Sequence, residues 1–317
     1  MEAIMQKDGF HNLGLKQTTY SNKILDFFLT FFGVLKAVFS LRCNDVLVLQ
    51  YPIKKYYYLL CFTAKVRGAK IITLVHDLGA FRRKKLTPAQ EIAKLSKSDV
   101  IIAHNPNMEA WLRENGFTKP IVLLGIWDYL GKQTRQIVKT KMPTSDIHFI
   151  GDLHPSQNAF LYLLSQRLSS HHLRLIGSNF QLDKAGKGTV YMGFRQDCDL
   201  MSAGLNGWGL SWYGEALDTG IGRVGEYMQI NNPHKVSLYL RCHLPIIIWE
   251  KAGLAQFVLE HGIGICIDSL ENIENAIAAV SEVEYKAMRE RVNILNNRIK
   301  HGYYFRNALQ HAMEHLA

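Results

Sequence analysis

Asn231-Asn232-Pro233-His234-Lys235-Val236 opens the stretch that decides the fold of this chain, and the stretch continues through Ser237-Leu238-Tyr239-Leu240 to the apolar run Pro245-Ile246-Ile247-Ile248. The pattern combines a polar turn, a lysine at the opening of a helix and a short apolar strand begun by proline. Backbone N–H groups at a helix start carry partial positive charge, so an anion placed there would be held by the helix dipole and by Lys235 together. The alternative is an ordinary loop and helix of an α/β domain, because helix starts of this kind are common.

Composition and charge limit the possible classes of protein. The chain has 317 residues, of which 48% are hydrophobic, so it can bury a large core and is long enough for about two domains. Its formal net charge of +10 favours acidic partners, namely nucleic acid, anionic lipid headgroups or phosphorylated substrates. The five cysteines are scattered and form no C-x-x-C pair, which predicts neither a disulfide framework nor a zinc site and fits a reducing cytosol.

The N-terminal region carries no basic segment followed by an apolar core and a cleavage site, so no secretory signal is expected. Residues 24–41 are rich in phenylalanine and leucine but are interrupted by charges. At helical spacing Asp26, Thr30, Gly33 and Lys36 form one narrow polar stripe. The segment is amphipathic and does not suit a membrane span. It is predicted to be a core helix under a sheet, with a helix lying in a membrane interface as the alternative.

Strand and helix patterns alternate along the remaining chain, which argues for parallel sheets. In the first half, strands are predicted at residues 45–50, 71–75, 100–103 and 121–124, and helices at 54–66, 88–95 and 108–115. In the second half, strands are predicted at 147–150, 173–176, 190–192, 209–212, 245–249 and 263–267, with helices from near Gln157 and at 235–242 and 254–261. Two helices then finish the chain, at 282–300 and 304–316.

A linker separates the two halves. Residues 132–145 are polar, contain Pro143 and lack an apolar period. We therefore predict an α/β fold with a first Rossmann-like domain over residues 1–135 and a second over residues 146–300. Two doubly wound sheets facing each other across a cleft are the most economical architecture.

Ligands of such sheets bind outside the carboxyl ends of the strands, so the residues that directly follow strands are candidate site residues. Gly151-Asp152-Leu153 and Gly177-Ser178-Asn179 each follow a predicted strand. Glycine there would let the backbone approach a phosphate. A glycine at a strand end is also what any tight turn from strand to helix requires, so each is weak when taken alone.

His76-Asp77 follows the predicted strand at 71–75. A histidine and a carboxylate at a strand tip could act as a general base that removes the proton of an attacking hydroxyl. Asp77 could equally cap the next helix.

Two charged clusters have alternative interpretations. Arg82-Arg83-Lys84-Lys85 could be a solvated face or could hold an acidic or lipid-linked acceptor. Asp197-Cys198-Asp199 has the spacing of a divalent-ion site, but it precedes Leu200-Met201 and is more typical of the first turn of a helix. The sequence therefore predicts no metal site.

Several separated segments occur in this order along the chain: His76-Asp77, His104-Asn105-Pro106, Trp127-Asp128-Tyr129-Leu130, Gly151, Gly209-Leu210-Ser211-Trp212-Tyr213-Gly214-Glu215, Gly225-Glu226-Tyr227, residues 231–248 and Gly302-Tyr303-Tyr304-Phe305. Together they resemble the bacterial polysaccharide glycosyltransferases that include β-1,6-galactofuranosyltransferases, and the chain is similar to the streptococcal glucosyltransferase that extends sugars on serine-rich adhesins. The resemblance covers nearly the whole chain.

The resemblance implies a GT-B fold, in which two Rossmann-like domains hold the acceptor mainly in the first and the sugar nucleotide mainly in the second. It also implies that residues 301–317 form a helix that crosses back onto the first domain, with Tyr303-Tyr304-Phe305 as an apolar anchor. Such enzymes generally need no bound metal, so the UDP-sugar is expected as a substrate and no cofactor is expected beside it.

The resemblance implies roles for individual residues as well. Lys235 would supply positive charge to the diphosphate, and Asp77, next to His76, would be the catalytic base. Arg82 and Arg83 would contact the acceptor or a lipid. The residues implied to contact the UDP-sugar are Gly151, Gly177, Asn179, Tyr213, Asn231, Asn232, Pro233, His234, Lys235 and Val236.

Three features depart from the pattern of the wider fold. Leu238 stands where many GT-B enzymes place a glutamate against the donor ribose, so the ribose hydroxyls must find another partner. Gln157 stands where relatives carry a lysine. No strand is predicted before Asp45, where the fold would be expected to have its first β-element.

We therefore expect a metal-independent hexosyltransferase that moves galactofuranose or glucose from a UDP-sugar to a saccharide acceptor, with galactofuranose slightly favoured. Direct attack of an acceptor hydroxyl on the anomeric carbon would be helped mainly by stabilisation of the leaving diphosphate. The expected location is the cytoplasm, and the sequence leaves three alternatives open: attachment to the inner face of the membrane, a lipid-linked acceptor and a homo-oligomeric state. The alternatives are a UDP-sugar epimerase of the same fold and a basic, non-enzymatic protein that binds membrane or nucleic acid, although no nucleic-acid motif supports the last.

Overall fold

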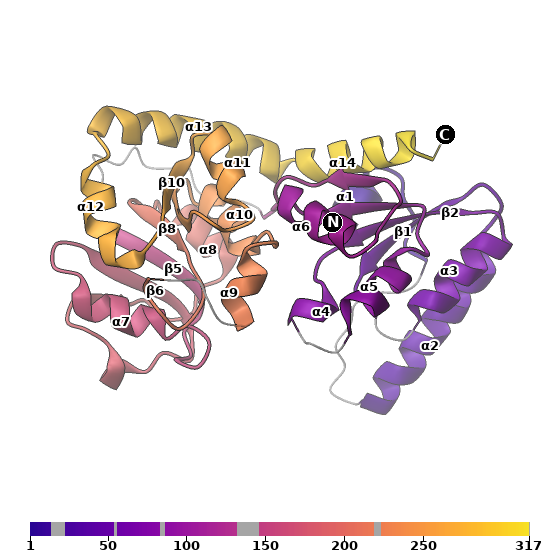
Figure 1. Ribbon diagram of the computed structural model, residues 1–317, viewed down its shortest axis with the longest axis horizontal. Coiled ribbons are helices and arrows are strands. Elements are labelled where there is room, and N and C mark those ends of the chain that lie inside the picture. The colour runs from indigo at the N-terminus through magenta and orange to yellow at the C-terminus, as the bar shows by residue number, and fades with distance from the viewer. Residues whose placement is uncertain (14–22, 54–55, 83–85, 132–145, 219–222, 317) are drawn as a thin grey trace. The chain divides into compact units, whose positions relative to one another are not determined.

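The computed structural model describes residues 1–13, 23–53, 56–82, 86–131, 146–218 and 223–316 (Figure 1). These residues form two compact units. The first contains Met1–Leu124 together with Phe305–Ala317, and the second contains Gly125–Tyr304. The predicted linker at residues 132–145 lies outside the described residues.

The first unit is built on a four-stranded parallel sheet with the strand order β1-β2-β3-β4. The strands are β1 (Val46–Tyr51), β2 (Lys70–Val75), β3 (Val100–Ala103) and β4 (Ile121–Leu123). Every residue of β3 and all but the first residue of β2 are buried, as expected for parallel strands covered on both faces. The described helices of the unit are α1 (Glu2–Lys7), α2 (Lys23–Ser40), α3 (Tyr57–Val66), α4 (Gly79–Arg82), α5 (Pro88–Leu95), α6 (Pro106–Glu114) and, from Phe305 onward, α14 (Tyr303–Glu314).

Local sequence signals fix the helix starts of this unit. Thr87 and Gln90 form a reciprocal capping box before α5, and the side chain of Asn105 accepts a hydrogen bond from the N–H of Met108 at the start of α6. Both helices carry proline at their beginning, where a missing N–H costs nothing.

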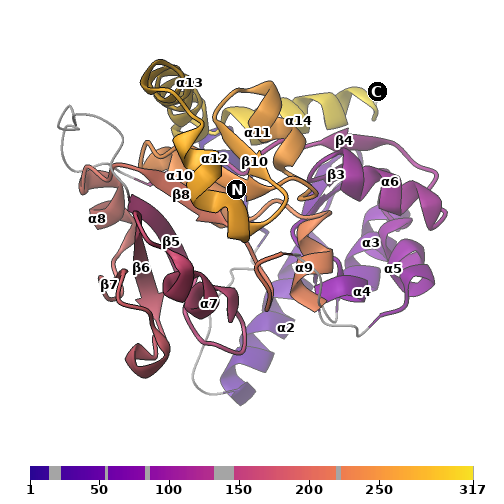
Figure 2. The same cartoon turned by 60° about the vertical axis from the view of Figure 1, so that its left-hand side comes forward.

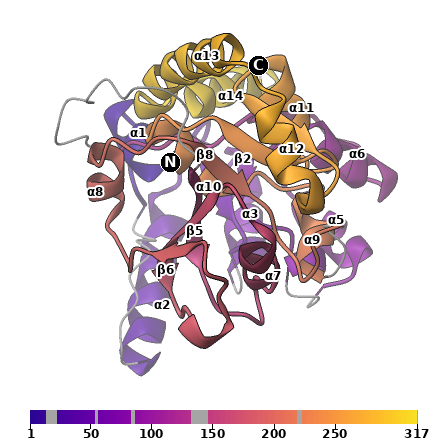
Figure 3. The same cartoon turned by 90° about the vertical axis from the view of Figure 1, so that its left-hand side faces the viewer.

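The second unit is built on a six-stranded parallel sheet with the order β10-β9-β8-β5-β6-β7. Its strands are β5 (Asp146–Asp152), β6 (His172–Ser178), β7 (Thr189–Tyr191), β8 (Trp208–Ser211), β9 (Ile246–Trp249) and β10 (Gly264–Ile267). Read from β7 to β10, this is the doubly wound order, in which the chain reverses direction across the sheet between β5 and β8. Figures 2 and 3 show the sheet with its helices from two further sides.

Helices of several lengths surround this second sheet. They are α7 (Phe160–Arg167), α8 (Asp197–Ser202), α9 (Arg223–Met228), α10 (His234–Arg241), α11 (Ala255–Glu260), α12 (Ile273–Ala278) and α13 (Glu282–Lys300), with short 3-10 turns at Leu182–Lys184 and Leu270–Asn272. β8 and β9 are buried at every position, and the core around them is rich in large aromatic side chains.

The structure confirms the predicted α/β class and all ten predicted strands, each within two residues at either end. The short helices α1, α4, α9 and α12 were not predicted, because six residues or fewer are too short to show an apolar period. The prediction that residues 24–41 form a core helix was wrong. In α2, Val34 and Ala37 are buried, whereas seven large apolar side chains between Leu25 and Phe39 are exposed.

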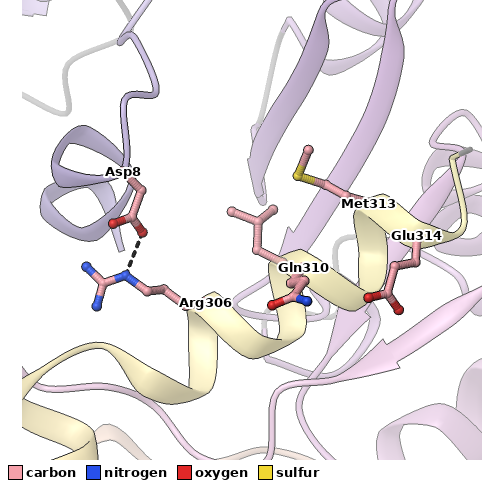
Figure 4. A pocket seen from close by; sticks show the side chains of 6 residues that line it. Asp8, Arg306, Gln310, Met313 and Glu314 are labelled. Carbon is pink, nitrogen blue, oxygen red and sulfur yellow. Dashed lines mark hydrogen bonds and ion pairs between the residues drawn. The ribbon is translucent and has the colours of Figure 1, made fainter.

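A shallow pocket of about 510 Å³ lies on the first unit between α14 and the residues after α1 (Figure 4). Arg306 Nε and Asp8 Oδ2 form an ion pair of 2.6 Å at one end of it. The remaining lining is Leu309, Gln310, Met313 and Glu314. It contains none of the predicted site residues.

Candidate active site

The last residues of β5 and β6 lie directly against each other at the carboxyl edge of the second sheet, where the structure places Gly151 and Gly177 inside the strands and not after them. Gly151 and Gly177 are opposite each other in the parallel register, with φ angles of 152° and 154°. A Cβ atom on Gly177 would stand 1.8 Å from the carbonyl oxygen of Gly151. Gly177 is therefore needed for the close approach of the two strand ends, which is a structural role for this glycine.

Lys235, in the first turn of α10, occupies an aromatic cage close to Gly151. Its Nζ lies 3.8 Å from the ring centroid of Phe149 and 4.0 Å from that of Tyr213. A Cβ on Gly151 would be 4.0 Å from the same Nζ. The cage thus brings together residues from β5, from the loop after β8 and from α10. These elements meet at the point where the strand order reverses, which is where doubly wound sheets bind ligands.

The charge of Lys235 is poorly compensated in the described part of the chain. Although the residue keeps some exposed surface, protein surrounds its ammonium group, and this burial lowers the pKa of Lys235 well below its usual value. No described carboxylate forms an ion pair with it. The faces of Phe149 and Tyr213 offer only the weaker attraction of aromatic rings for a cation. An anionic ligand would supply the missing charge.

The start of α10 also suits an anion. Pro233 precedes the helix, no described side chain caps the first turn, and the first turn contains no acidic residue. The N–H groups of a helix start and a lysine in the same turn are a combination that binds phosphate groups.

Two buried polar atoms near this edge have no hydrogen-bond partner within the described chain. They are Ser211 Oγ, at the end of β8, and Asn231 Oδ1, in the loop before α10. Buried polar groups are normally paired, so unpaired ones beside a cage of this kind favour a ligand-binding role. The importance of Ser211 and Phe149 was missed from the sequence, because both lie inside buried strands that read as core.

Tyr239 of α10 fixes how β5 and β8 lie next to each other, at the point where the strand order reverses. Its hydroxyl donates to the carbonyl of Leu210 at 2.9 Å and accepts from the N–H of Ile150 at 3.0 Å. The hydroxyl therefore joins β8 to β5 just before the two strands end, and burial raises the pKa of Tyr239, so it stays protonated.

The segment Gly125–Gly131 holds the loop before α10 in place. Trp127 Nε1 donates to the carbonyl of Asn232 at 2.8 Å, and Asn232 Nδ2 donates to the carbonyl of Gly125 at 2.9 Å. Ser237 Oγ donates to the carbonyl of Trp127 at 2.6 Å, and the ring of His234 stacks on that of Trp127 with centroids 4.6 Å apart. These contacts lie within one unit and set the conformation of residues 231–237.

The remaining predicted donor residues fall into two groups. Asn232, Pro233 and Val236 are buried, so they shape the turn and the helix start rather than present side chains at the surface. Asn179 is exposed, and its Nδ2 donates to Asp152 Oδ1 at 2.9 Å. That hydrogen bond, against the opposing effect of partial burial, lowers the pKa of Asp152 and keeps it ionised.

In the first unit, His76 and Asp77 follow β2 as predicted. His76 Nε2 lies 3.0 Å from Gln50 Oε1, and Asp77 is partly buried. The buried carboxylate of Glu91 accepts from the N–H of Ala80 at 2.6 Å and from the hydroxyl of Tyr51, so it orders the loop that carries Asp77. The cluster at 82–85 cannot be placed: residues 83–85 lie outside the described part, as does the side chain of Arg82.

The described residues contain neither a cluster of metal ligands nor a membrane-spanning helix. No three or more histidine, cysteine, aspartate or glutamate side chains among them lie close enough to hold a metal ion. Asp197 accepts a hydrogen bond from Tyr129 and begins α8, as the helix interpretation of 197–199 predicts. Within the same residues, no helix is both long and apolar enough to cross a membrane.

Two family models match the chain: the Glucosyltransferase 3-like N-terminal domain over residues 1–126 and the Glucosyltransferase 3-like C-terminal domain over residues 147–312. The chain belongs to the glucosyltransferase 3-like family. This glucosyltransferase 3-like protein is therefore a glycosyltransferase, as the sequence predicts. An epimerase or a non-enzymatic basic protein does not fit this membership.

Named relatives agree with this family. The β-1,6-galactofuranosyltransferase WbbI of Escherichia coli (strain K12) is 28% identical over 280 residues, which are 87% of this chain and 82% of the relative. Glucosyltransferase 3 of Streptococcus gordonii is 23% identical over 279 residues, 85% of this chain and 79% of the relative. Both are hexosyltransferases by name, and so is this glucosyltransferase 3-like protein by its family.

Solved structures show the same fold. The lipopolysaccharide outer core galactosyltransferase WaaB, in its apo form, superposes with a TM-score of 0.58 at 12% identity, covering 92% of this chain and 83% of WaaB. WaaG, a glycosyltransferase involved in lipopolysaccharide biosynthesis, gives a TM-score of 0.50 at 11% identity, covering 81% of each chain. The glucosyltransferase 3-like protein thus has the predicted GT-B fold.

Proposed function

We propose that this protein transfers a hexose from a UDP-sugar to a hydroxyl group of a saccharide acceptor, in the synthesis of a cell-surface polysaccharide or glycoconjugate. The observation that carries the proposal is the aromatic cage of Lys235, which surrounds a buried lysine amine that has no described ion-pair partner in the first turn of α10. A diphosphate is the anion that both the helix start and the lysine fit. Galactofuranose is slightly favoured as the sugar, because a galactofuranosyltransferase is 28% identical and the glucosyltransferase is 23% identical.

The reaction requires one bond to form and one to break. The oxygen of the acceptor hydroxyl attacks the anomeric carbon, the bond from that carbon to the β-phosphate oxygen breaks, and UDP leaves with an additional negative charge. Lys235 and the first N–H groups of α10 stabilise that charge, which we expect to be the largest catalytic contribution. Asp77 accepts the hydroxyl proton. The leaving group is thereby stabilised by the protein's own cation, and we propose that no bound metal ion is needed.

The donor site is tested by calorimetric titration of the purified protein with UDP, UDP-glucose and UDP-galactofuranose, each with and without a divalent ion. We expect UDP to bind without the ion and Lys235→Ala to weaken binding by about a hundredfold, since a buried charge-assisted contact contributes several kcal/mol. The matched control is Lys286→Ala, which removes an exposed lysine from α13 and should leave binding unchanged. Unchanged UDP affinity in Lys235→Ala would show that the donor site lies elsewhere.

The base is tested separately by Asp77→Asn. This substitution keeps the shape of the side chain and removes its basicity, so kcat should fall by about a hundredfold or more while the affinity for UDP stays the same. Asp183→Asn, at an exposed aspartate of the second unit, is the control. If Asp77→Asn retains full kcat, another group accepts the proton.

A further inference from the structure

The outward face of α2 is apolar, which is the reverse of what a helix on a water-exposed surface normally shows. Val34 and Ala37, with Leu41 just after the helix, are buried at the spacing i, i+3 and i+7, which fixes the inward side of α2. The opposite side is formed by four exposed side chains, here called the α2 face: Leu25, Phe28, Phe32 and Phe39. Phe32 is 62% exposed and Phe39 is 73% exposed.

The polar residues of α2 do not cover this face. Asp26 and Gly33 fall on the flank of the helix between its inward and outward sides, and Thr30 falls on the inward side, one turn before Val34. An ordinary surface helix would direct such residues toward water and keep phenylalanine away from it. The α2 face is therefore built for contact with an apolar medium or partner.

The neighbouring helix α3 extends the apolar surface. α2 packs against α3 (Figure 1), and α3 exposes four further large apolar side chains: Tyr58, Leu59, Phe62 and Val66. α3 contains no carboxylate. Phe62 and Val66, one helical turn apart, are 67% and 68% exposed.

The charges at this surface are mostly positive. Lys36 lies beside the α2 face, and Lys65 and Arg67 are exposed at the end of α3. Against them, the described part of α2 and α3 carries the single carboxylate of Asp26. Cations on long side chains beside exposed aromatic rings are the composition of helices that lie in the headgroup region of anionic membranes.

Other possible occupants fit less well. Residues 14–22, which precede α2, contain only Leu15 and Tyr20 as large apolar residues, too few to cover both exposed helices. A second copy of the chain would place the cations of both copies together, and each copy already carries a net charge of +10. An anionic lipid surface matches the apolar face and the positive charge at once.

We propose that α2 lies in the interface of a bilayer that contains anionic lipid, with the α2 face at the boundary of the acyl chains and Lys36 reaching the headgroups. The helix lies on the membrane and does not cross it, in agreement with the lack of a membrane-spanning helix among the described residues. This attachment goes beyond the proposed transfer reaction and does not depend on it, because it uses no residue of the donor site.

The test is flotation of the full-length protein with vesicles of phosphatidylcholine alone and of phosphatidylcholine mixed with phosphatidylglycerol. We expect the protein to float with the mixed vesicles, to float less with the neutral ones, and to be released by added salt. The variant Phe32→Gln/Phe39→Gln should bind the mixed vesicles about tenfold less, because two exposed rings no longer enter the interface. Its melting temperature should match that of the wild type, since both side chains are already exposed in the fold.

The matched control is Leu182→Gln/Val283→Gln, which removes two side chains of the second unit that are each 78% exposed. It should float as the wild type does. Equal flotation of Phe32→Gln/Phe39→Gln and the wild type would overturn the proposal. The proposal would also be overturned if the wild type bound neither kind of vesicle and instead formed an oligomer. In that case light scattering would show that Phe32→Gln/Phe39→Gln dissociates the oligomer. UDP binding is measured on the same samples, so that a failure of the membrane proposal can be distinguished from a failure of the proposed donor site.

Discussion

The indole of Trp127 and the carbonyl of Asn232 are joined by a hydrogen bond of 2.8 Å across 105 residues of sequence. The same indole stacks on His234, which begins α10. The conformation of the turn before Lys235 is therefore stabilised by the segment Gly125–Gly131, which precedes every strand of the second sheet in the sequence. A contact between residues far apart in sequence therefore helps to shape the candidate anion site.

Replacing Trp127 should weaken donor binding, because Trp127 supports the turn that precedes Lys235. Trp127→Phe keeps an aromatic ring for His234 and removes the Nε1 donor, so the buried carbonyl of Asn232 loses the hydrogen bond from the indole. We expect a loss of about 1–3 kcal/mol of unfolding free energy. The UDP affinity should fall several-fold with kcat less affected. Urea unfolding and calorimetry measure the two effects, and Trp111→Phe in α6 of the first unit is the control.

The lowered pKa of Lys235 predicts that UDP binding takes up protons. Burial disfavours the charged ammonium in the unliganded fold, and a bound diphosphate favours it, so binding should raise the pKa of Lys235. Calorimetry in buffers of different ionisation enthalpy should show uptake of up to about one proton per UDP. Lys235→Met should abolish the uptake and Lys286→Ala should retain it. Binding without uptake in the wild type would mean that Lys235 is already charged.

The lowered pKa of Lys235 also makes the stability of the unliganded protein depend on pH. A lysine whose pKa is lower in the folded state binds fewer protons there than in the unfolded chain, so the unliganded protein gains stability as pH rises from the folded pKa toward about 10.4. Lys235→Met should therefore be more stable than the wild type near neutral pH, and the difference should shrink in alkaline solution. Thermal unfolding of both proteins from neutral to alkaline pH checks the sign of this stability difference.

Gly177 and Gly193 provide a matched pair of glycines. A Cβ on Gly177 would collide with the carbonyl of Gly151, whereas Gly193, at a φ of 72°, has nothing within 4 Å of its Cβ position. Gly193→Ala should cost about 1–2 kcal/mol from its left-handed backbone alone. Gly177→Ala should cost at least about 3 kcal/mol, because backbone atoms must move apart. Equal losses in urea unfolding would mean that the ends of β5 and β6 separate easily.

The strands could be predicted because each is a short, continuous apolar run, and such runs in an alternating pattern specify parallel sheets. The sequence also predicts an anion site at the start of α10, from a lysine in the first turn after a polar loop, and that site stays a prediction. Both inferences use residues that are close together in sequence.

The residues that the sequence did not reveal act over long separations. Phe149 reads as a core residue of β5, and only the fold places its ring beside Lys235. The α2 helix was assigned to the core because its apolar content is high, but content does not say which side of a helix faces protein. That depends on Val34 and Ala37, which are small enough to pack closely.

Glu274 should make the second unit sensitive to acid. Its carboxylate accepts hydrogen bonds from the backbone N–H groups of Ser169, Ser170 and His171 and from both serine hydroxyls. Burial alone would raise the pKa of Glu274, but these hydrogen bonds outweigh it and hold the pKa well below its usual value.

The linkage between proton binding and folding gives the direction in which the stability changes with pH. A carboxylate whose folded pKa is depressed contributes stability above its unfolded pKa of about 4.3, and that contribution is lost as pH falls toward the folded value. Glu274→Gln should therefore be clearly less stable than the wild type at neutral pH and nearly equal to it in strong acid. Glu282→Gln, at an exposed position of α13, is the control and should follow the wild type at both pH values. A deficit in Glu274→Gln that stays constant with pH would show that the shape of the loop, and not the charge of Glu274, provides the stability.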